Sequence, residues 1–83
     1  MKRDQFIESV RNFIISKSKV KTTDVGADTP LIDSGIVDSL LITELIIYVE
    51  DVLSVDIDID DFRLASFRTI GTIYERYATE ARA

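Results

Sequence analysis

The tripeptide Asp38-Ser39-Leu40 holds the residues best placed to do chemistry, because its serine hydroxyl stands just where a long helical pattern begins. At the start of a helix, unpaired backbone N–H groups and the positive end of the helix dipole favour an attached phosphate. Asp and Ser are also the preferred helix-capping residues, so the tripeptide by itself is explained as well or better by a simple cap. Its surroundings in the sequence must decide between the two interpretations.

Two residue types that many enzymes need are missing, since the chain has no cysteine and no histidine. Without cysteine it has no disulfide, no thiolate nucleophile and no cysteine metal ligand. Without histidine it lacks the commonest general base and the commonest metal ligand at neutral pH. We therefore expect that the protein is not an enzyme, and that it has neither catalytic residues nor a metal site.

Acidic residues alternate from Asp56 to Asp60, like the beginning of a calcium-binding loop. An EF-hand requires glycine at its sixth position and glutamate at its twelfth, but these positions hold Asp61 and Phe67. We therefore reject an EF-hand, which leaves only unspecific binding of divalent ions. Acidic loop residues are usually turn formers or solvated, so we assign no catalytic role to three further residues: Asp24, Asp28 and Asp33.

The first helix is expected from Asp4 to about Lys17, with Asp4 as its N-cap. Its apolar face consists of Phe6, Ile7, Val10, Phe13 and Ile14. A long connection rich in turn-forming residues follows, from about Ser18 to Asp38. Loops of this length in small domains tend to be functional. We expect four apolar residues to hold it against the core: Leu31, Ile32, Ile36 and Val37.

The strongest helical pattern runs from Asp38-Ser39 to about Leu53. Its Ile and Val content would also suit a β-strand, but its length and the helical spacing of its acidic residues favour a helix. We expect the face that this helix turns to the core to consist of Ile42, Leu45, Ile46, Val49 and Leu53.

Shorter elements follow. A short extended linker is expected over residues 56–60, followed by a helical turn that Asp60 or Asp61 would cap. That turn would contain Phe62, Leu64 and Ala65. Thr69 is the expected N-cap of a last helix. Its inward face would carry Ile70, Ile73, Tyr74 and Tyr77.

Together these elements predict an all-α fold: a small helical bundle of three main helices plus a short third helix, with a long loop between helices 1 and 2. The length of 83 residues suits a single domain, which we place at residues 1–83. No apolar stretch is long enough to span a membrane, and we expect no secretory signal, because the first residues run straight into an amphipathic pattern. We expect a cytoplasmic monomer. The net charge of −5 argues against nucleic acid as a partner and favours basic protein surfaces.

The stretch Asp33-Ser34-Gly35-Ile36-Val37-Asp38-Ser39-Leu40 resembles the signature of the acyl carrier protein superfamily, in which Asp-Ser-Leu follows a glycine-containing loop. Asp-Ser-Leu alone is a weak motif. The resemblance, however, covers nearly the whole chain, including Thr29-Pro30-Leu31, the apolar second helix and Phe67-Arg68-Thr69-Ile70. In this place, within this order of helices, the motif is a strong one.

The resemblance implies that Ser39 carries a covalent 4′-phosphopantetheine arm, whose thiol holds an acyl or aminoacyl group as a thioester. It implies three kinds of partner in a biosynthetic pathway: a phosphopantetheinyl transferase, an ATP-dependent loading enzyme and downstream acyl-accepting or modifying enzymes. It also implies partner contacts at Asp38, Leu40, Glu44, Glu50 and Asp51, to which we add Ile47 as an apolar candidate contact on the same helix. For the acidic residues among them, an ordinary solvated helix face is the alternative explanation.

The second helix departs from that of the best-known fatty-acid carriers. Ile36-Val37 stands where those carriers often have a small pair, Leu41 replaces a commonly polar residue, and Tyr48 replaces a small one. We therefore expect extra exposed apolar surface at Leu40, Leu41, Ile47 or Tyr48; tighter packing against the long loop is the alternative. The pattern is more similar to carriers of aminoacyl or specialised acyl groups, including D-alanyl carrier proteins. The alternative function is an unmodified helical protein-interaction module of the same fold.

Overall fold

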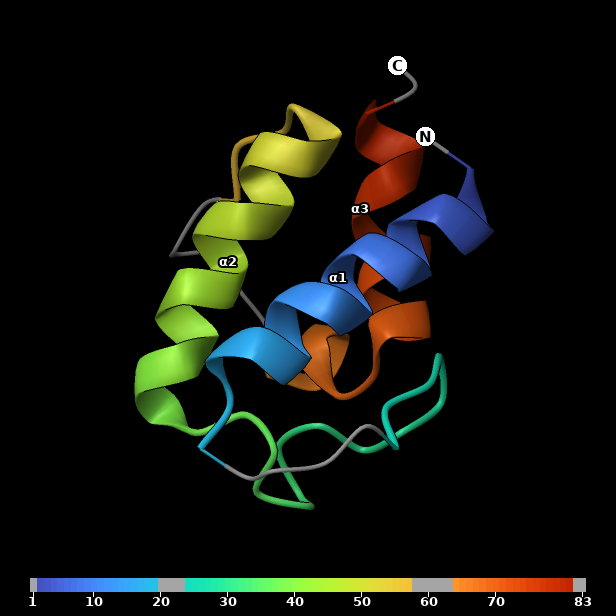
Figure 1. The fold of residues 1–83 in the computed structure, drawn as a ribbon. Coiled ribbons are helices and arrows are strands. Elements are labelled where there is room, and N and C mark those ends of the chain that lie inside the picture. Colours follow the sequence, from blue (N-terminus) through green and yellow to red (C-terminus); the bar gives the residue numbers. More distant parts are fainter. Residues whose placement is uncertain (1, 20–23, 58–63, 82–83) are drawn as a thin grey trace.

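The computed structural model describes residues 2–19, 24–57 and 64–81. These ranges contain three α-helices, α1 (Arg3–Lys17), α2 (Ser39–Leu53) and α3 (Ile70–Ala81), and the short 3₁₀ helix η2 (Leu64–Phe67). They contain no strand, so the expected all-α class is confirmed. In Figure 1, α2 and α3 stand on either side of α1, and residues 24–38 run along one end of the helices. The radius of gyration is 11.7 Å, close to the value of about 12 Å expected for a compact chain of this length.

Helix α1 begins one residue earlier than the sequence pattern predicts. Lys2 is its N-cap, and the Lys2 carbonyl accepts the first helical hydrogen bond, from Phe6 N–H at 2.9 Å. The Gln5 side chain supports this start, because its Oε1 accepts from Lys2 N–H at 3.2 Å. The prediction of Asp4 as N-cap is therefore wrong. Asp4 lies in the first turn, where a negative charge suits the helix dipole.

Helix α2 has the predicted bounds, and its inward face matches the predicted one at Leu45, Val49 and Leu53. Its buried residues are Leu41, Leu45, Val49 and Leu53, which lie four apart and form one row along the helix. Ile42 and Ile46 are only partly buried at the margin of that row, so Leu41 takes the inward place predicted for Ile42. The row packs against α1 and α3, which contribute Phe6, Val10, Ile14, Ile70, Ile73 and Tyr77 to the same core.

Helix α3 begins as predicted, because Thr69 Oγ1 accepts from Thr72 N–H at 3.1 Å and thus caps the first turn. The short helix before it is η2. The cap predicted at Asp60 or Asp61, and Phe62 in the same turn, lie outside the described residues. Among the described elements, no helix is long and apolar enough to cross a membrane.

The connection between α1 and α2 is held against the core, as expected. Leu31, Ile36 and Val37 are buried, and Ile32 is partly buried. Leu31 also joins the connection to the end of η2, since its N–H donates to the carbonyl of Arg68 at 2.8 Å. The segment just before Ser39 is therefore fixed by both burial and hydrogen bonds.

The outer part of the connection is tied to two helices. Arg11 Nε on α1 donates to Val25 O at 2.9 Å, and Gly71 N–H on α3 donates to Ala27 O at 2.9 Å. A Cβ atom at position 71 would lie 3.1 Å from Ala27 O. Glycine therefore permits this close approach of loop and helix.

Candidate functional site

Ser39 is the first residue of α2 and is exposed to solvent. The capping role belongs to its neighbour, because Asp38 Oδ1 accepts from Leu41 N–H at 2.8 Å. In the part of the chain that the structure describes, no residue forms a hydrogen bond with the Ser39 hydroxyl. The tripeptide left open whether it caps the helix or carries out chemistry, and the structure assigns these two roles to different residues. Asp38 caps the helix, and Ser39 Oγ is available for chemistry.

The surroundings of Ser39 suit an attached phosphate. Within the described ranges, the backbone N–H groups of Ser39 and Leu40 have no acceptor, as is usual in the first turn of a helix. They lie at the positive end of the α2 dipole. Lys19 adds a cation nearby, with its Nζ 3.9 Å from Asp38 Oδ2; both side chains are exposed, so the pair itself adds little stability.

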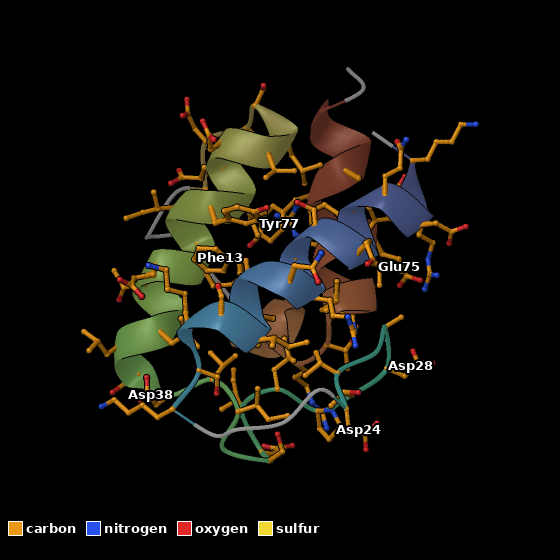
Figure 2. All side chains as sticks on the ribbon, viewed as in Figure 1. Phe13, Asp24, Asp28, Asp38, Glu75 and Tyr77 are labelled. Atoms are coloured by element: carbon orange, nitrogen blue, oxygen red, sulfur yellow. The ribbon has the colours of Figure 1, made fainter. Side chains whose placement is uncertain are left out.

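A pocket of about 400 Å³ opens directly beside the serine, between the end of the connection and the first turn of α2. We call it the Ser39 pocket. Gly35 forms part of its wall with φ of 82°, a left-handed conformation that glycine adopts without strain. The described lining residues are Ile32, Gly35, Val37, Asp38, Ser39 and Ile42. Figure 2 shows Asp38 at the end of α2 where the connection enters.

The outer face of α2 carries apolar and acidic side chains together. Leu40 and Ile47 are 67% and 61% exposed, the two large apolar side chains left exposed in the described ranges. Glu44 and Asp51 are exposed on the same helix. The predicted exposure of Leu40 and Ile47 is therefore confirmed.

Leu41 and Tyr48 do not add to this exposed surface. Leu41 is only 5% exposed, because it belongs to the row that faces the core. Tyr48 is partly buried; its ring stacks on Phe13 of α1 at 4.2 Å between centroids, and its hydroxyl hydrogen-bonds to that of Ser9. The expected extra exposure is thus provided by Leu40 and Ile47 alone. Tyr48 packs against α1 and not against the long loop that the alternative proposed.

A second pocket of about 360 Å³, the α1–α2 pocket, lies between these two helices. Phe13 and Lys17, one turn apart on α1, form one side of it, and sequence reasoning did not assign them to a site. Figure 2 shows Phe13 between α1 and α2. The only signal in the sequence was their i, i+4 spacing beside the core face. The described lining residues are Phe13, Lys17, Glu44, Ile47, Tyr48 and Asp51.

Glu50 differs from the other acidic residues of α2. It is partly buried, and its Oε2 accepts from Ile57 N–H at 2.8 Å. The solvated helix face offered as the alternative explanation therefore does not describe Glu50, since its carboxylate holds the segment that follows the helix. Asp56 in that segment is exposed, whereas Asp58 and Asp60 lie outside the described residues.

The acidic residues of the connection do not gather around Ser39. Asp33 pairs with Arg68, with Oδ2 3.8 Å from Nη2. Asp24 and Asp28 lie on the part of the connection far from Asp38 (Figure 2). Within the described ranges, no three His, Cys, Asp or Glu residues are grouped so as to hold a metal ion.

An all-helical fold that presents an exposed serine at the start of α2, with an acidic and apolar face on the same helix, is the arrangement expected of a small carrier domain. The family model described as "Phosphopantetheine attachment site" matches residues 8–76. The chain therefore belongs to the phosphopantetheine attachment site family and is a phosphopantetheine-carrying carrier protein, as its resemblance to acyl carrier proteins implied. The cofactor of this family is covalent 4′-phosphopantetheine. A search of curated proteins found no match to the chain.

Proposed function

We propose that Ser39 is the attachment residue, and that the protein holds an acyl or aminoacyl group as a thioester on the arm and presents it to partner enzymes. The observation that carries this proposal is that Asp38 caps α2 and so leaves the exposed Ser39 hydroxyl available. The free N–H groups of the first turn would then face the phosphodiester.

The attachment reaction would be a phosphoryl transfer from coenzyme A, catalysed by a phosphopantetheinyl transferase. Ser39 Oγ would form a bond to the phosphorus next to the pantetheine, the anhydride bond would break, and adenosine 3′,5′-bisphosphate would leave. The serine proton would pass to a base of the transferase. The arm supplies a thiol for thioester chemistry that this cysteine-free chain lacks, while the protein's own residues present and orient it.

The outer face of α2 is the proposed docking surface for partners. Leu40 and Ile47 would supply apolar contact, and Glu44 and Asp51 would supply negative charge along the helix that Ser39 begins. Complementary charges speed encounter and fix orientation, which suits a carrier that must also leave each partner. The loading enzyme would use ATP, and downstream enzymes would accept or modify the cargo. We place the protein in the cytoplasm as a monomer, with cargo of the aminoacyl or specialised acyl kind.

The test is the intact mass of the protein after incubation with coenzyme A, magnesium and a broad-specificity transferase. We expect the mass of one arm to be added to the wild type and none to Ser39→Ala. Ser16→Ala is the matched control, because Ser16 is an exposed serine on α1 whose hydroxyl donates only to Phe13 O within its own helix; this variant should be modified fully.

Addition of an arm to Ser39→Ala would refute the assignment of the residue. A wild-type protein that gains no mass would instead favour the second function, an unmodified interaction module that binds partners through the same face of α2.

A further inference from the structure

The Ser39 pocket has a mostly apolar wall, although Ser39 and Asp38 also line it. Ile32, Val37 and Ile42 supply most of its wall, and Ile32 and Ile42 are only partly buried, so their side chains remain accessible from the pocket. Its volume of about 400 Å³ falls in the range of about 300–1,000 Å³ of small-molecule sites.

A more polar pocket lies on the other side of Ile32. This pocket of about 320 Å³, the Arg68 pocket, is lined in the described ranges by Ile32, Asp33, Ala65 and Arg68. The connection and the end of η2 are fixed against each other here by the hydrogen bond from Leu31 N–H to Arg68 O at 2.8 Å. Ile32 is therefore a shared wall, with apolar surface towards Ser39 and the Asp33–Arg68 ion pair beyond it.

The chemical groups of a phosphopantetheine arm follow the same order. Next to the phosphate comes the pantoyl part, whose quaternary carbon carries two methyl groups, and after it come two amides and the thiol. With the phosphate bonded to Ser39 Oγ, the two methyl groups are only a few bonds away from that oxygen. They therefore lie close to the pocket that Ser39 lines. The amides lie farther along, where polar side chains can meet them.

We propose that the Ser39 pocket binds the pantoyl part of the arm, and that the rest of the arm runs past Ile32 into the Arg68 pocket. This inference rests on the proposed attachment at Ser39. The pantoyl methyl groups pack against Ile32 and Ile42, which removes apolar surface of both arm and pocket from water. Both pockets are open at the surface, so the arm leaves this position when a partner enzyme offers a competing site.

The test is NMR of the modified full-length protein with labelled isoleucine and alanine methyl groups, compared with the unmodified protein. We expect nuclear Overhauser contacts from the pantoyl methyl protons to the δ1 methyls of Ile32 and Ile42, and a shift of the Ala65 methyl signal. Ile47 is the internal control, because it lines the α1–α2 pocket instead, and its signal should not move.

Ile32→Gln should abolish the contact between the arm and Ile42, whereas the same substitution at exposed Ile47 should leave it intact. A protein that carries a full arm by mass but shows no contact at Ile32 and Ile42, or shows contacts at Ile47, would overturn the arm-binding proposal and leave the attachment at Ser39 standing. A protein that gains no arm fails at the earlier step and refutes the proposed function itself.

Discussion

Single residues at the start of α2 have separate tasks. Asp38 uses Oδ1 to satisfy the N–H of Leu41, while its Oδ2 faces Lys19. Ser39 takes no part in the cap. Because the helix start does not depend on the serine hydroxyl, chemical modification of that hydroxyl does not remove an interaction that stabilises the fold.

The two roles of Asp38, as a cap and as a negative charge, can be separated by substitution. Asp38→Ala should lower the free energy of unfolding by about 1 kcal/mol, because it removes the cap. Asp38→Asn should keep nearly the wild-type stability, because asparagine caps helices about as well as aspartate. Urea unfolding measures both effects.

The same pair of variants tests recognition by the transferase. Both variants remove the negative charge of Asp38. If the transferase recognises that charge, the rate of arm addition should fall in both. If the alanine variant alone is slowed, Asp38 acts on modification only through the helix start, and its assignment as a recognition residue is refuted.

At the scale of elements, the acidic residues of α2 are not equivalent. Glu44 and Asp51 are exposed beside Ile47, whereas Glu50 accepts a hydrogen bond from Ile57 N–H. Reversing the charge of Glu50 would disturb the segment after α2 as well as any docking surface. Glu44 and Asp51 are therefore the cleaner positions at which to test docking.

We predict that Glu44→Lys and Asp51→Lys slow loading or transfer, and that the defect shrinks as salt is raised. At 0.1 M ionic strength, salt screens the interaction between exposed charges that are more than about 10 Å apart. Complementary charges mainly raise the rate at which two proteins encounter each other. Loading rates at low and high ionic strength give the measurement. Asp58→Lys serves as comparison and should load normally; if it alone is impaired, the linker and not α2 is the docking element.

The sequence predicted elements well where local rules decide. The start of α2 at Ser39 and of α3 after Thr69 follow from capping preferences, and both are confirmed. The burial of Leu41 in place of Ile42 was missed because both residues are apolar. Only packing against α1 and α3 decides which of them is buried.

The contacts of Tyr48 and Glu50 were not predicted, for the same physical reason. Tyr48 is covered by Phe13, and Glu50 bonds to a backbone N–H seven residues later. Both contacts depend on how separate segments meet, which periodicity along one helix does not encode. The Ser39 pocket, which Ile32 and Ile42 help to line, also depends on how two separate segments meet.

At the scale of the whole molecule, one core joins the three helices and the connection. Leu45 lies in the middle of α2 and is fully buried in this core. Leu45→Ala should cost about 2–5 kcal/mol of the free energy of unfolding, a large part of the total of about 5–15 kcal/mol typical of small domains. Ile47→Ala, at an exposed position of the same helix, should change stability far less. Equal unfolding midpoints in urea for the two variants would show that α2 faces the other way.

The hydrogen bonds between the connection and the last quarter of the chain bear on the order of folding. Ala27 bonds to Gly71 and Leu31 to Arg68, so each pair closes a long stretch of chain. Closing such a stretch lowers the entropy of the chain before any contact is gained, and contacts distant in sequence form slowly for that reason. We expect these bonds to form only after α3 has docked. The surroundings of Ser39 are then complete only in a chain that has been synthesised past α3. A transferase that recognises those surroundings would therefore modify the chain only after α3 has emerged and docked.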